Sequence, residues 1–353
     1  MRIVVKIGSS SLTTKQQIDA SKLQDHVDAV AYIKKLGHEV IIVSSGAVAA
    51  GFKRLGYPSR PVTLKGKQAA AAIGQSILIQ HYSDLFSGHN LNVAQVLLTR
   101  DDFTHKKRFQ NAQATLTELL ERNIIPIINE NDTVSIAELT FGDNDMLSAL
   151  VAAHMHADFL IILTDINGLY TDNPNTNKDA IRIQQVEDVT EDLFTMATGT
   201  SSSVGTGGMT TKLSAAKYAI ENGVHTFVGT GTGQEKFYDI MNYDGDGTYF
   251  KKKVEYNRSI KRWLTLTEPN GKLFIDEGAN EAIVNCGKSL LVTGITNCSG
   301  HFESGDVVDV CYDGKVVGRG EIECSDDELI ELINQTNKER SKVIIHRDAW
   351  VKL

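Results

Sequence analysis

Two segments rich in glycine, serine and threonine, each with a lysine, could hold a phosphate group. Residues 206–212 read Thr-Gly-Gly-Met-Thr-Thr-Lys and open onto a helix-like stretch at residues 213–222. Backbone N–H groups, hydroxyls and an ammonium at a helix N-terminus together bind an anion, although a flexible linker before a helix would have a similar composition. Residues 6–11, Lys-Ile-Gly-Ser-Ser-Ser, directly follow an apolar strand-like run. Two such segments on one chain favour a nucleotide polyphosphate as ligand, and hence a kinase.

Small or polar residues also follow several other predicted strands. Residues 43–51 pass from strand to helix through serine, glycine and alanine, which leaves room for a ligand beside N–H groups. Amides and carboxylates gather in Asn-Glu-Asn-Asp at residues 129–132 and in Gly-Asp-Asn-Asp at residues 142–145. Such groups can bind an ammonium, position a metal through water, or simply cap helices. Capping and close helix packing remain alternatives for each segment taken alone.

A scaffold must bring these segments to one place, and the pattern up to about residue 240 predicts it. Short runs that are apolar on both faces alternate with amphipathic helical stretches, which is typical of a mostly parallel sheet sandwiched by helices. Such an α/β sheet binds its ligand where its strands end. The predicted strands are residues 3–7, 39–43, 92–97, 124–128, 159–163 and 224–228, and the predicted helices include residues 21–36, 67–86, 108–122 and 145–156.

Length and charge exclude several classes of function. The 353 residues suffice for one large and one small domain. A formal net charge of −8 gives no global attraction to nucleic acid or anionic membranes, so any affinity for anions must be local. No apolar run approaches the roughly 20 residues of a membrane span. The strand-like start of the chain leaves no room for a signal peptide, and we expect a cytoplasmic protein.

The cysteines and histidines show no metal-ligand spacing. We expect the cysteines, which include no Cys-x-x-Cys pair, to be buried thiols of a reduced protein. His154 and His156, two residues apart on a predicted helix, point in different directions and do not form a metal pair. The cysteines all lie in the last quarter of the chain, at Cys286, Cys298, Cys311 and Cys324.

The last quarter of the chain differs in composition from the rest. Residues 251–262 carry six basic residues and one acidic residue, and we interpret residues 251–271 as a basic linker. Short β-like runs separated by glycines then predict a small β-rich barrel. Residues 272–353 carry nine basic and fifteen acidic residues, a balance that disfavours RNA binding. We therefore predict domains at residues 1–250 and 272–353.

Taken in order, the polar segments resemble the amino acid kinase family. The resemblance covers about residues 1–250 and is greatest to those members that phosphorylate glutamate. The last part of the chain resembles a PUA domain in residues 276–279, 288–291 and 300–306, and the two domains together are the arrangement of the bacterial glutamate-phosphorylating members. The segments that carry the first resemblance are Lys6 with Gly8, residues 44–46, 129–132 and 142–145, the turn from Thr164 and Asp165 to Tyr170, and residues 206–212.

The resemblance implies a role for each site residue. Lys6 and Lys212 would contact the phosphates of ATP and act in catalysis with Asp145, which would orient the lysines or a Mg²⁺ shell. Mg²⁺ itself would be held mainly by the ATP phosphates, with no direct protein ligand. Glutamate would be bound by Ser45, Gly46, Asn129, Asp132 and Asn144. The other residues implied to line ATP are Gly8, Thr164, Asp165, Thr206, Gly207, Gly208, Met209, Thr210 and Thr211.

The implied reaction moves the γ-phosphoryl group of ATP to the γ-carboxylate of L-glutamate, as the first step of proline biosynthesis. This carboxylate is ionised at neutral pH, so no general base is needed. The obstacle is repulsion between two anions, which two lysines and Mg²⁺ would reduce. The resemblance further implies feedback inhibition by proline, a dimer or tetramer, and a downstream reductase that forms glutamate semialdehyde. The alternatives are another carboxylate kinase of the family, or an RNA-associated PUA protein with a regulatory kinase-like domain.

Overall fold

A computed structural model of the protein describes residues 1–353 except residues 16, 135–143, 173, 175, 176, 199–207, 253–263, 265, 266 and 335–341. The described residues form two compact units. One consists of Met1–Phe103 with Arg108–Val254, and the other of Thr104–Lys107 with Glu255–Leu353. Most of the predicted linker lies outside the described residues, so the domain boundaries given above stay predictions.

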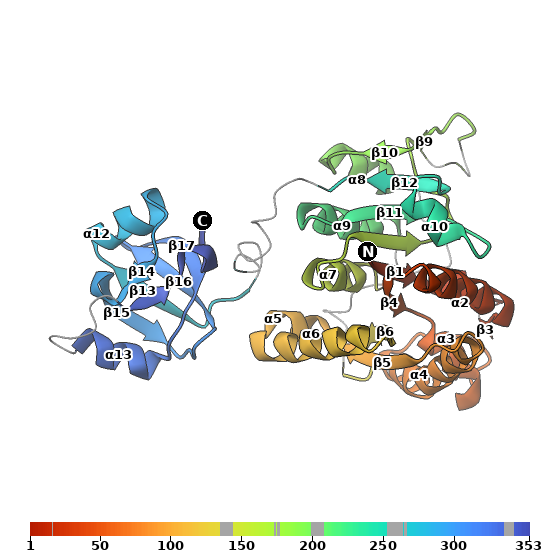
Figure 1. The fold of residues 1–353 in the computed structure, drawn as a ribbon, viewed down its shortest axis with the longest axis horizontal. Helices are drawn as coiled ribbons and strands as arrows, with labels where there is room; N and C mark the ends of the chain where they lie inside the picture. The colour runs from red at the N-terminus through yellow and green to blue at the C-terminus, as the bar shows by residue number, and fades with distance from the viewer. Residues whose placement is uncertain are drawn as a thin grey trace. The chain divides into compact units, whose positions relative to one another are not determined.

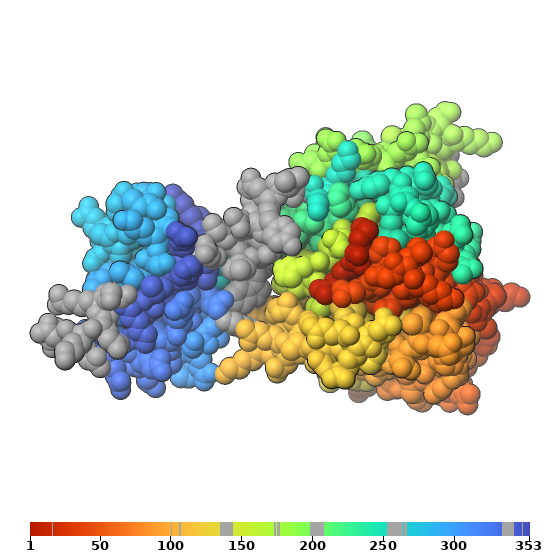
Figure 2. Space-filling model, viewed as in Figure 1, coloured from red at the N-terminus to blue at the C-terminus, as the bar shows by residue number. Residues whose placement is uncertain are grey.

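An eight-stranded sheet forms the centre of the first unit (Figure 1). Its order is β10-β12-β11-β7-β1-β4-β6-β5, and all neighbours are parallel except β11 and β12. The predicted mostly parallel sheet is therefore confirmed. In the space-filling view the red N-terminal segments accordingly lie between the orange and yellow segments and the green ones (Figure 2). The strands are β1 (Arg2–Ile7), β4 (Glu39–Ser44), β5 (Val93–Leu98), β6 (Ile125–Glu130), β7 (Phe159–Leu163), β10 (Gln185–Val186), β11 (His225–Gly229) and β12 (Gly247–Phe250).

Helices cover both faces of this sheet. Apolar residues of α2, α4 and α10 pack on one face with Ile3, Val5 and Ile7 of β1. Residues of α6, α7, α8 and α9 pack on the other face with Val4. Because side chains alternate along a strand, Lys6 shares the face of Val4 and points toward α7 and α9. These helices are α2 (Ala20–Lys35), α4 (Leu64–Ser87), α6 (Lys106–Glu121), α7 (Asp145–His154), α8 (Glu191–Thr198), α9 (Met209–Glu221) and α10 (Lys236–Met241).

A pair of glycines lets α4 approach the short helix α3 (Ala47–Gly51) very closely. A Cβ atom added to Gly51 would lie 2.0 Å from the carbonyl oxygen of Ala70, and one added to Gly74 would lie 1.8 Å from that of Ala47. A side chain at either position would force the two helices apart. The remaining elements of this unit are α1 (Ser9–Leu12), η1 (Phe52–Leu55), α5 (Arg100–Thr104), β2 (Thr13–Thr14), β3 (Gln17–Ile18), β8 (Leu169–Tyr170) and β9 (Arg182–Ile183).

The second unit is built on a five-stranded sheet in the order β15-β13-β16-β17-β19. A separate pair, β14 with β18, and several short helices pack with it around one apolar core. This confirms the predicted β-rich fold. The elements are β13 (Gly271–Ile275), α12 (Glu277–Asn280), η2 (Glu281–Asn285), β14 (Leu290–Leu291), η3 (Val292–Gly294), β15 (Ile295–Gly300), β16 (Val307–Tyr312), β17 (Lys315–Glu321), α13 (Asp326–Asn334), β18 (Val343–Ile345), η4 (Arg347–Ala349) and β19 (Trp350–Lys352).

One expectation for this unit is wrong. Cys311 and Cys324 are buried, but Cys286 is exposed and Cys298 is only partly buried. Cys286 directly follows η2, where the chain leaves the core for a turn, and sequence spacing carries no information on that. Within the described part of the chain, no helix combines the length and the apolar character that crossing a membrane requires.

Candidate active site

Two lysines and one aspartate form a buried ionic cluster where β1 ends. Lys6 Nζ lies 2.7 Å from Asp145 Oδ1, and Lys212 Nζ lies 3.2 Å from Asp145 Oδ2. The hydroxyl of Thr211 donates to Asp145 Oδ2 at 2.7 Å. The side chains of Lys6 and Asp145 are fully buried, and that of Lys212 is 6% exposed. With two ammonium groups around one carboxylate, this cluster carries excess positive charge and can receive an anion.

The charge of Asp145 is held by its neighbours. Burial is the largest influence and by itself raises the pKa of this carboxyl, but the charges of Lys6 and Lys212 and the hydrogen bonds from Lys6 and Thr211 together outweigh it. The net result is a lowered pKa. Asp145 is therefore an anion at neutral pH and a permanent partner for both ammonium groups.

The packing of three elements makes this cluster. Lys6 leaves β1 on the face covered by α7 and α9, Asp145 is the first residue of α7, and Lys212 lies in the first turn of α9. The sequence pattern placed Lys212 in a loop before a helix, but α9 already begins at Met209, behind an extended Gly208. The reason is that Met209 is buried in the core and ties the start of the helix to it.

The backbone around the cluster leaves room for phosphate groups. A Cβ atom added to Gly8 would lie 3.2 Å from Lys6 Nζ, so glycine keeps the approach to this ammonium open. A Cβ atom added to Gly208 would meet no described residue within 4 Å, which leaves space among the described residues beside the first turn of α9. These residues therefore fit the polyphosphate that the sequence predicts.

One wall of the site comes from the turns after β7 and β11. Thr164 donates its backbone N–H to the carbonyl oxygen of Gly229 at 3.0 Å and its hydroxyl to the exposed Asp165 at 3.1 Å. Asp246 joins the two turns, since it accepts from Asn167 at 3.1 Å and from Thr230 at 3.0 Å, and pairs with Arg182. Thr164 and Asp165 thus lie on a braced turn next to the strand that carries Lys6.

A second cluster, of hydroxyl and amide groups, lies where β4 and β6 end. The amide nitrogen of Asn144 donates to the carbonyl oxygen of Ser44 at 2.8 Å and to Asn129 Oδ1 at 2.7 Å, and it lies 3.3 Å from Ser45 Oγ. Ser45, Asn129 and Asn144 are all buried. Gly46, at φ 102°, turns the chain from β4 into α3 with a backbone conformation that favours glycine.

Asn144 also joins the amide cluster to the ionic one. It occupies the N-cap position of α7 in the left-handed conformation, at φ 60°, and is followed directly by Asp145. Asparagine is one of the few residues that adopt this conformation readily. A single backbone turn thereby presents an amide to one cluster and a carboxylate to the other.

The remaining predicted residues are placed less closely. Asp132 lies beyond the end of β6, partly buried, and its pKa is raised to about 6, first by burial and then by the charge of Glu130, against an opposing effect of Arg60. Thr210 lies in α9 and is partly buried. Thr206 and Gly207, together with Asp143 of the predicted polar run, lie outside the described residues.

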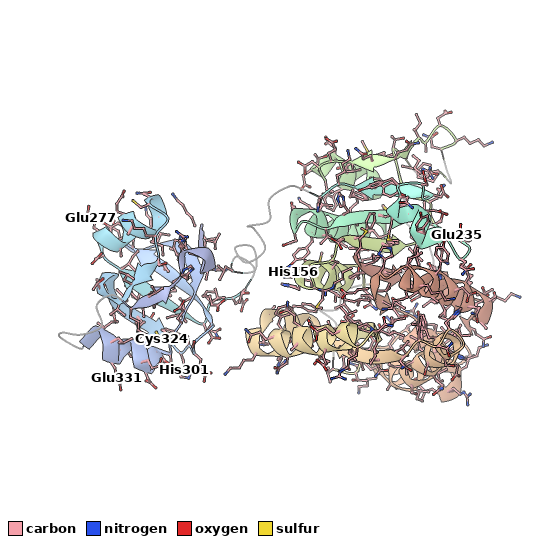
Figure 3. The ribbon with its side chains drawn as sticks, in the orientation of Figure 1. His156, Glu235, Glu277, His301, Cys324 and Glu331 are labelled. Atoms are coloured by element: carbon pink, nitrogen blue, oxygen red, sulfur yellow. The ribbon has the colours of Figure 1, made fainter. Side chains whose placement is uncertain are left out.

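The side-chain view shows which labelled residues lie at each end of the strands. Figure 3 labels His156, which precedes β7, and Glu235, which precedes α10 and follows β11; they lie at opposite ends of the strands. The site described above is at the end where β1 and β7 finish, so His156 is far from it. The structure also places Gln75 of α4 beside the amide cluster, although this residue belongs to no motif singled out in the sequence. Its Oε1 accepts a hydrogen bond from Asn129 at 2.8 Å.

Comparison with known proteins agrees with the resemblance found in the sequence. Residues 1–229 match the amino acid kinase family, and residues 271–344 match the PUA domain. Glutamate 5-kinase 1 of Bacillus subtilis is 50% identical over 359 residues, covering 100% of this chain and 98% of its own length. Glutamate 5-kinase of Bacillus cereus is 51% identical over 366 residues, covering 100% of this chain and 99% of its own length.

Solved structures share the fold of the first unit at low sequence identity. An isopentenyl phosphate kinase of T. acidophilum in a product complex has a TM-score of 0.51 and 16% identity, covering 71% of this chain and all of that one. A carbamate kinase of Giardia lamblia bound to AMP-PNP has a TM-score of 0.50 and 17% identity, covering 71% of this chain and 98% of that one. The family match and the full-length relatives place the chain: it belongs to the amino acid kinase family and carries a PUA domain after its kinase domain.

Proposed function

We propose that the protein is a glutamate 5-kinase, which transfers the γ-phosphoryl group of ATP to the γ-carboxylate of L-glutamate in the first step of proline biosynthesis. The observation that carries this proposal is the pairing of two clusters through one turn: the cationic cluster of Lys6, Lys212 and Asp145 adjoins the amide cluster through Asn144. Sequence identities of 50% and 51% to full-length glutamate 5-kinases support glutamate as the substrate.

In this proposal the phosphates of ATP lie against Lys6, Gly8 and the first turn of α9. Thr164 and Asp165 border the nucleotide on the wall formed by the turns after β7 and β11. Mg²⁺ on the phosphates supplies further positive charge when it is bound. Thr206 and Gly207, which the sequence predicts to line ATP, belong to the same segment, residues 206–212.

The chain's own groups supply positioning and charge rather than a base. Lys6 and Lys212, both buried, neutralise the charge that builds up on the transferred phosphoryl group. Asp145 holds both ammonium groups at fixed positions, so that little reorganisation is needed during the reaction. The acceptor is already an anion, and its attack needs alignment rather than deprotonation.

Glutamate is held by groups of complementary polarity. Asn144 has both amide hydrogens engaged, so its Oδ1 is the atom that can accept from the α-ammonium, assisted by the carboxylate of Asp132. Ser45 and the backbone at Gly46 can donate to the α-carboxylate. The product is an acyl phosphate, which hydrolyses readily. The proposal therefore includes a downstream reductase that consumes it. From the family resemblance, the proposal also includes feedback inhibition by proline and a dimer or tetramer.

The first test is the choice of substrate. With Mg-ATP and hydroxylamine as a trap, we expect γ-glutamyl hydroxamate from L-glutamate and little hydroxamate from N-acetylglutamate or aspartate, and ADP release should show little turnover of carbamate or UMP. N-acetylation removes the ammonium that Asn144 and Asp132 would accept. A preference for N-acetylglutamate in this colorimetric screen would show that the substrate is wrongly assigned.

A second test uses the titration of Asp132. Because the pKa of this carboxyl is raised to about 6, it is ionised above pH 6 and becomes protonated below it. Only the ionised form can pair with the α-ammonium, so the KM for glutamate should rise roughly tenfold between pH 7 and pH 5. The KM for ATP, measured in parallel, is the control. Asp132→Asn should have a raised KM for glutamate that no longer changes over this range; an Asn variant with the wild-type profile would exclude Asp132 from the site.

A further inference from the structure

Four amide side chains form a continuous hydrogen-bonded series that reaches the amide cluster from the edge of the sheet. Gln75 of α4 donates to Gln95 of β5 at 3.0 Å, Asn129 of β6 donates to Gln75 at 2.8 Å, and Asn144 donates to Asn129 at 2.7 Å. Gln95 is exposed on the edge strand, whereas the other three are buried. Asn129 and Asn144, at one end of the series, are among the groups proposed to bind glutamate, and Gln75 and Gln95 lie behind them.

Backbone groups fix the direction of this series. The backbone N–H of Glu130 donates to Asn129 Oδ1 at 2.9 Å, and the carbonyl oxygen of Ser44 accepts from Asn144 Nδ2 at 2.8 Å. A backbone N–H can only donate and a carbonyl oxygen can only accept. Asn129 must therefore turn its oxygen toward Glu130 and its nitrogen toward Gln75, and Asn144 must turn its nitrogen toward Ser44. Gln75 has to present Oε1, not Nε2, to Asn129.

This direction determines the polarity of the site. Both lone pairs of Asn129 Oδ1 are engaged, by Glu130 and by Asn144, and both hydrogens of Asn144 Nδ2 are engaged, by Asn129 and by the Ser44 carbonyl. Asn144 is left with Oδ1 as its group for a ligand, and an acceptor suits a cation rather than a carboxylate. The α-ammonium of an amino acid is such a cation.

We propose that Gln75 is a positioning residue for the amino-acid substrate: its acceptor on Asn129 keeps Asn144 Oδ1 directed at the α-ammonium. This inference rests on the proposed function. Without Gln75 Oε1, the buried Nδ2 of Asn129 would lose its hydrogen bond, a costly state for a polar group. Rotation of the Asn129 amide toward another acceptor would relieve it, and this rotation withdraws Oδ1 from Asn144. Recognition of the ammonium is then weakened, while Lys6, Asp145 and Lys212 are untouched.

The test compares substrates with and without the ammonium. Glutarate has the two carboxylates of glutamate but no amino group. For the full-length protein we expect Gln75→Met, which keeps length and removes the acceptor, to lower the ratio of kcat/KM for glutamate to that for glutarate roughly tenfold. The change should lie in the KM for glutamate, with the KM for ATP unchanged. A general loosening of the site would lower kcat/KM equally for both substrates and leave the ratio unchanged.

Two further variants make the result specific. Gln75→Glu keeps an acceptor oxygen for Asn129, and the exposed amide of Gln95 can turn its nitrogen toward the new carboxylate, so this variant should recover a ratio within about threefold of wild type. Gln80→Met makes the same change on an exposed residue of the same helix, whose amide donates to Asp84 at 2.6 Å, and should change neither ratio nor KM. If Gln75→Met does not fold, Gln75→Asn, whose shorter side chain withdraws the acceptor, is judged by the same ratio.

The outcomes separate this inference from the function on which it rests. A wild-type protein that phosphorylates no glutamate overturns the proposed function. A wild-type protein that does so, with an unchanged ratio in Gln75→Met or an equal loss in Gln75→Glu, overturns only the role of Gln75.

Discussion

Replacing Lys6 by methionine should lower kcat for glutamate phosphorylation about 10²–10³-fold, because removing one donor that stabilises transition-state charge costs on the order of 3–4 kcal/mol. Lys212→Met should have an effect of the same order. Both ammonium groups contact Asp145 in a buried site, where no solvent can replace them. Steady-state kinetics at saturating ATP and glutamate measures the change.

A matched control is available on the same helix as Lys212. Lys217 lies on α9, with its Nζ 5.9 Å from the centre of the Phe194 ring and no contact to Asp145. Lys217→Met should keep kcat within about twofold, as expected for a surface substitution away from the site. If Lys6→Met or Lys212→Met kept more than a tenth of the wild-type kcat, the catalytic role of that lysine would be refuted.

Asp145→Ala should have the largest effect on stability. It leaves two buried ammonium groups close together without their carboxylate, and removing one partner of a buried ionic group typically costs about 3–5 kcal/mol. For a domain of this size that corresponds to a fall in the melting temperature of roughly 6–20 °C. Circular dichroism of the full-length protein measures the transition. Because the pKa of Asp145 is lowered from its ordinary value of 3.8, the difference from wild type should be constant above pH 5 and shrink only as the pH falls below 4.

The cause of this loss can be checked with anions and a second substitution. Inorganic tripolyphosphate can take the place of the missing carboxylate, so it should raise the melting temperature of Asp145→Ala more than that of wild type. Asp145→Ala with Lys212→Met removes the repulsion between the ammonium groups and should melt above the single variant. Equal melting temperatures for Asp145→Ala and wild type would contradict the ionic account of the cluster.

The sequence predicted the strands well because their apolar runs are local. β1, β4, β6, β7 and β11 all lie within two residues of their predicted bounds. It did not predict β12, a four-residue strand that α10 separates from its antiparallel partner β11, nor the start of α9 at Met209. Those features depend on partners that are distant in the chain.

Some features of the candidate site could likewise be predicted from the sequence, and others could not. Lys6 lies near the end of β1, shortly before a run of glycine and serine, and Asn144 and Asp145 stand at a helix start; such patterns are visible in a sequence. The ion pairs among Lys6, Asp145 and Lys212 depend on which face of β1 meets α7 and α9, which is a tertiary property. Gln75 left no signal at all, because an amide within a helix, like Gln68 and Gln80 of the same helix, looks like a surface residue. Only the contact of α4 with the end of β6 gives it a place in the site.

The strand order has a consequence for how such an enzyme diverges. On the assignments proposed above, the strands on one side of β1, namely β7 and β11, bear the nucleotide wall, and those on the other side, β4 and β6, bear the acceptor groups. Lys6 on β1 and the turn at Asn144 and Asp145 stand on the boundary. One half of the sheet can therefore accumulate substitutions that admit a new acceptor while the other half, under selection for the same nucleotide, stays constant. Gene variants that exchange only β4, β6 and α4 are the natural units for redesigning the acceptor in the laboratory.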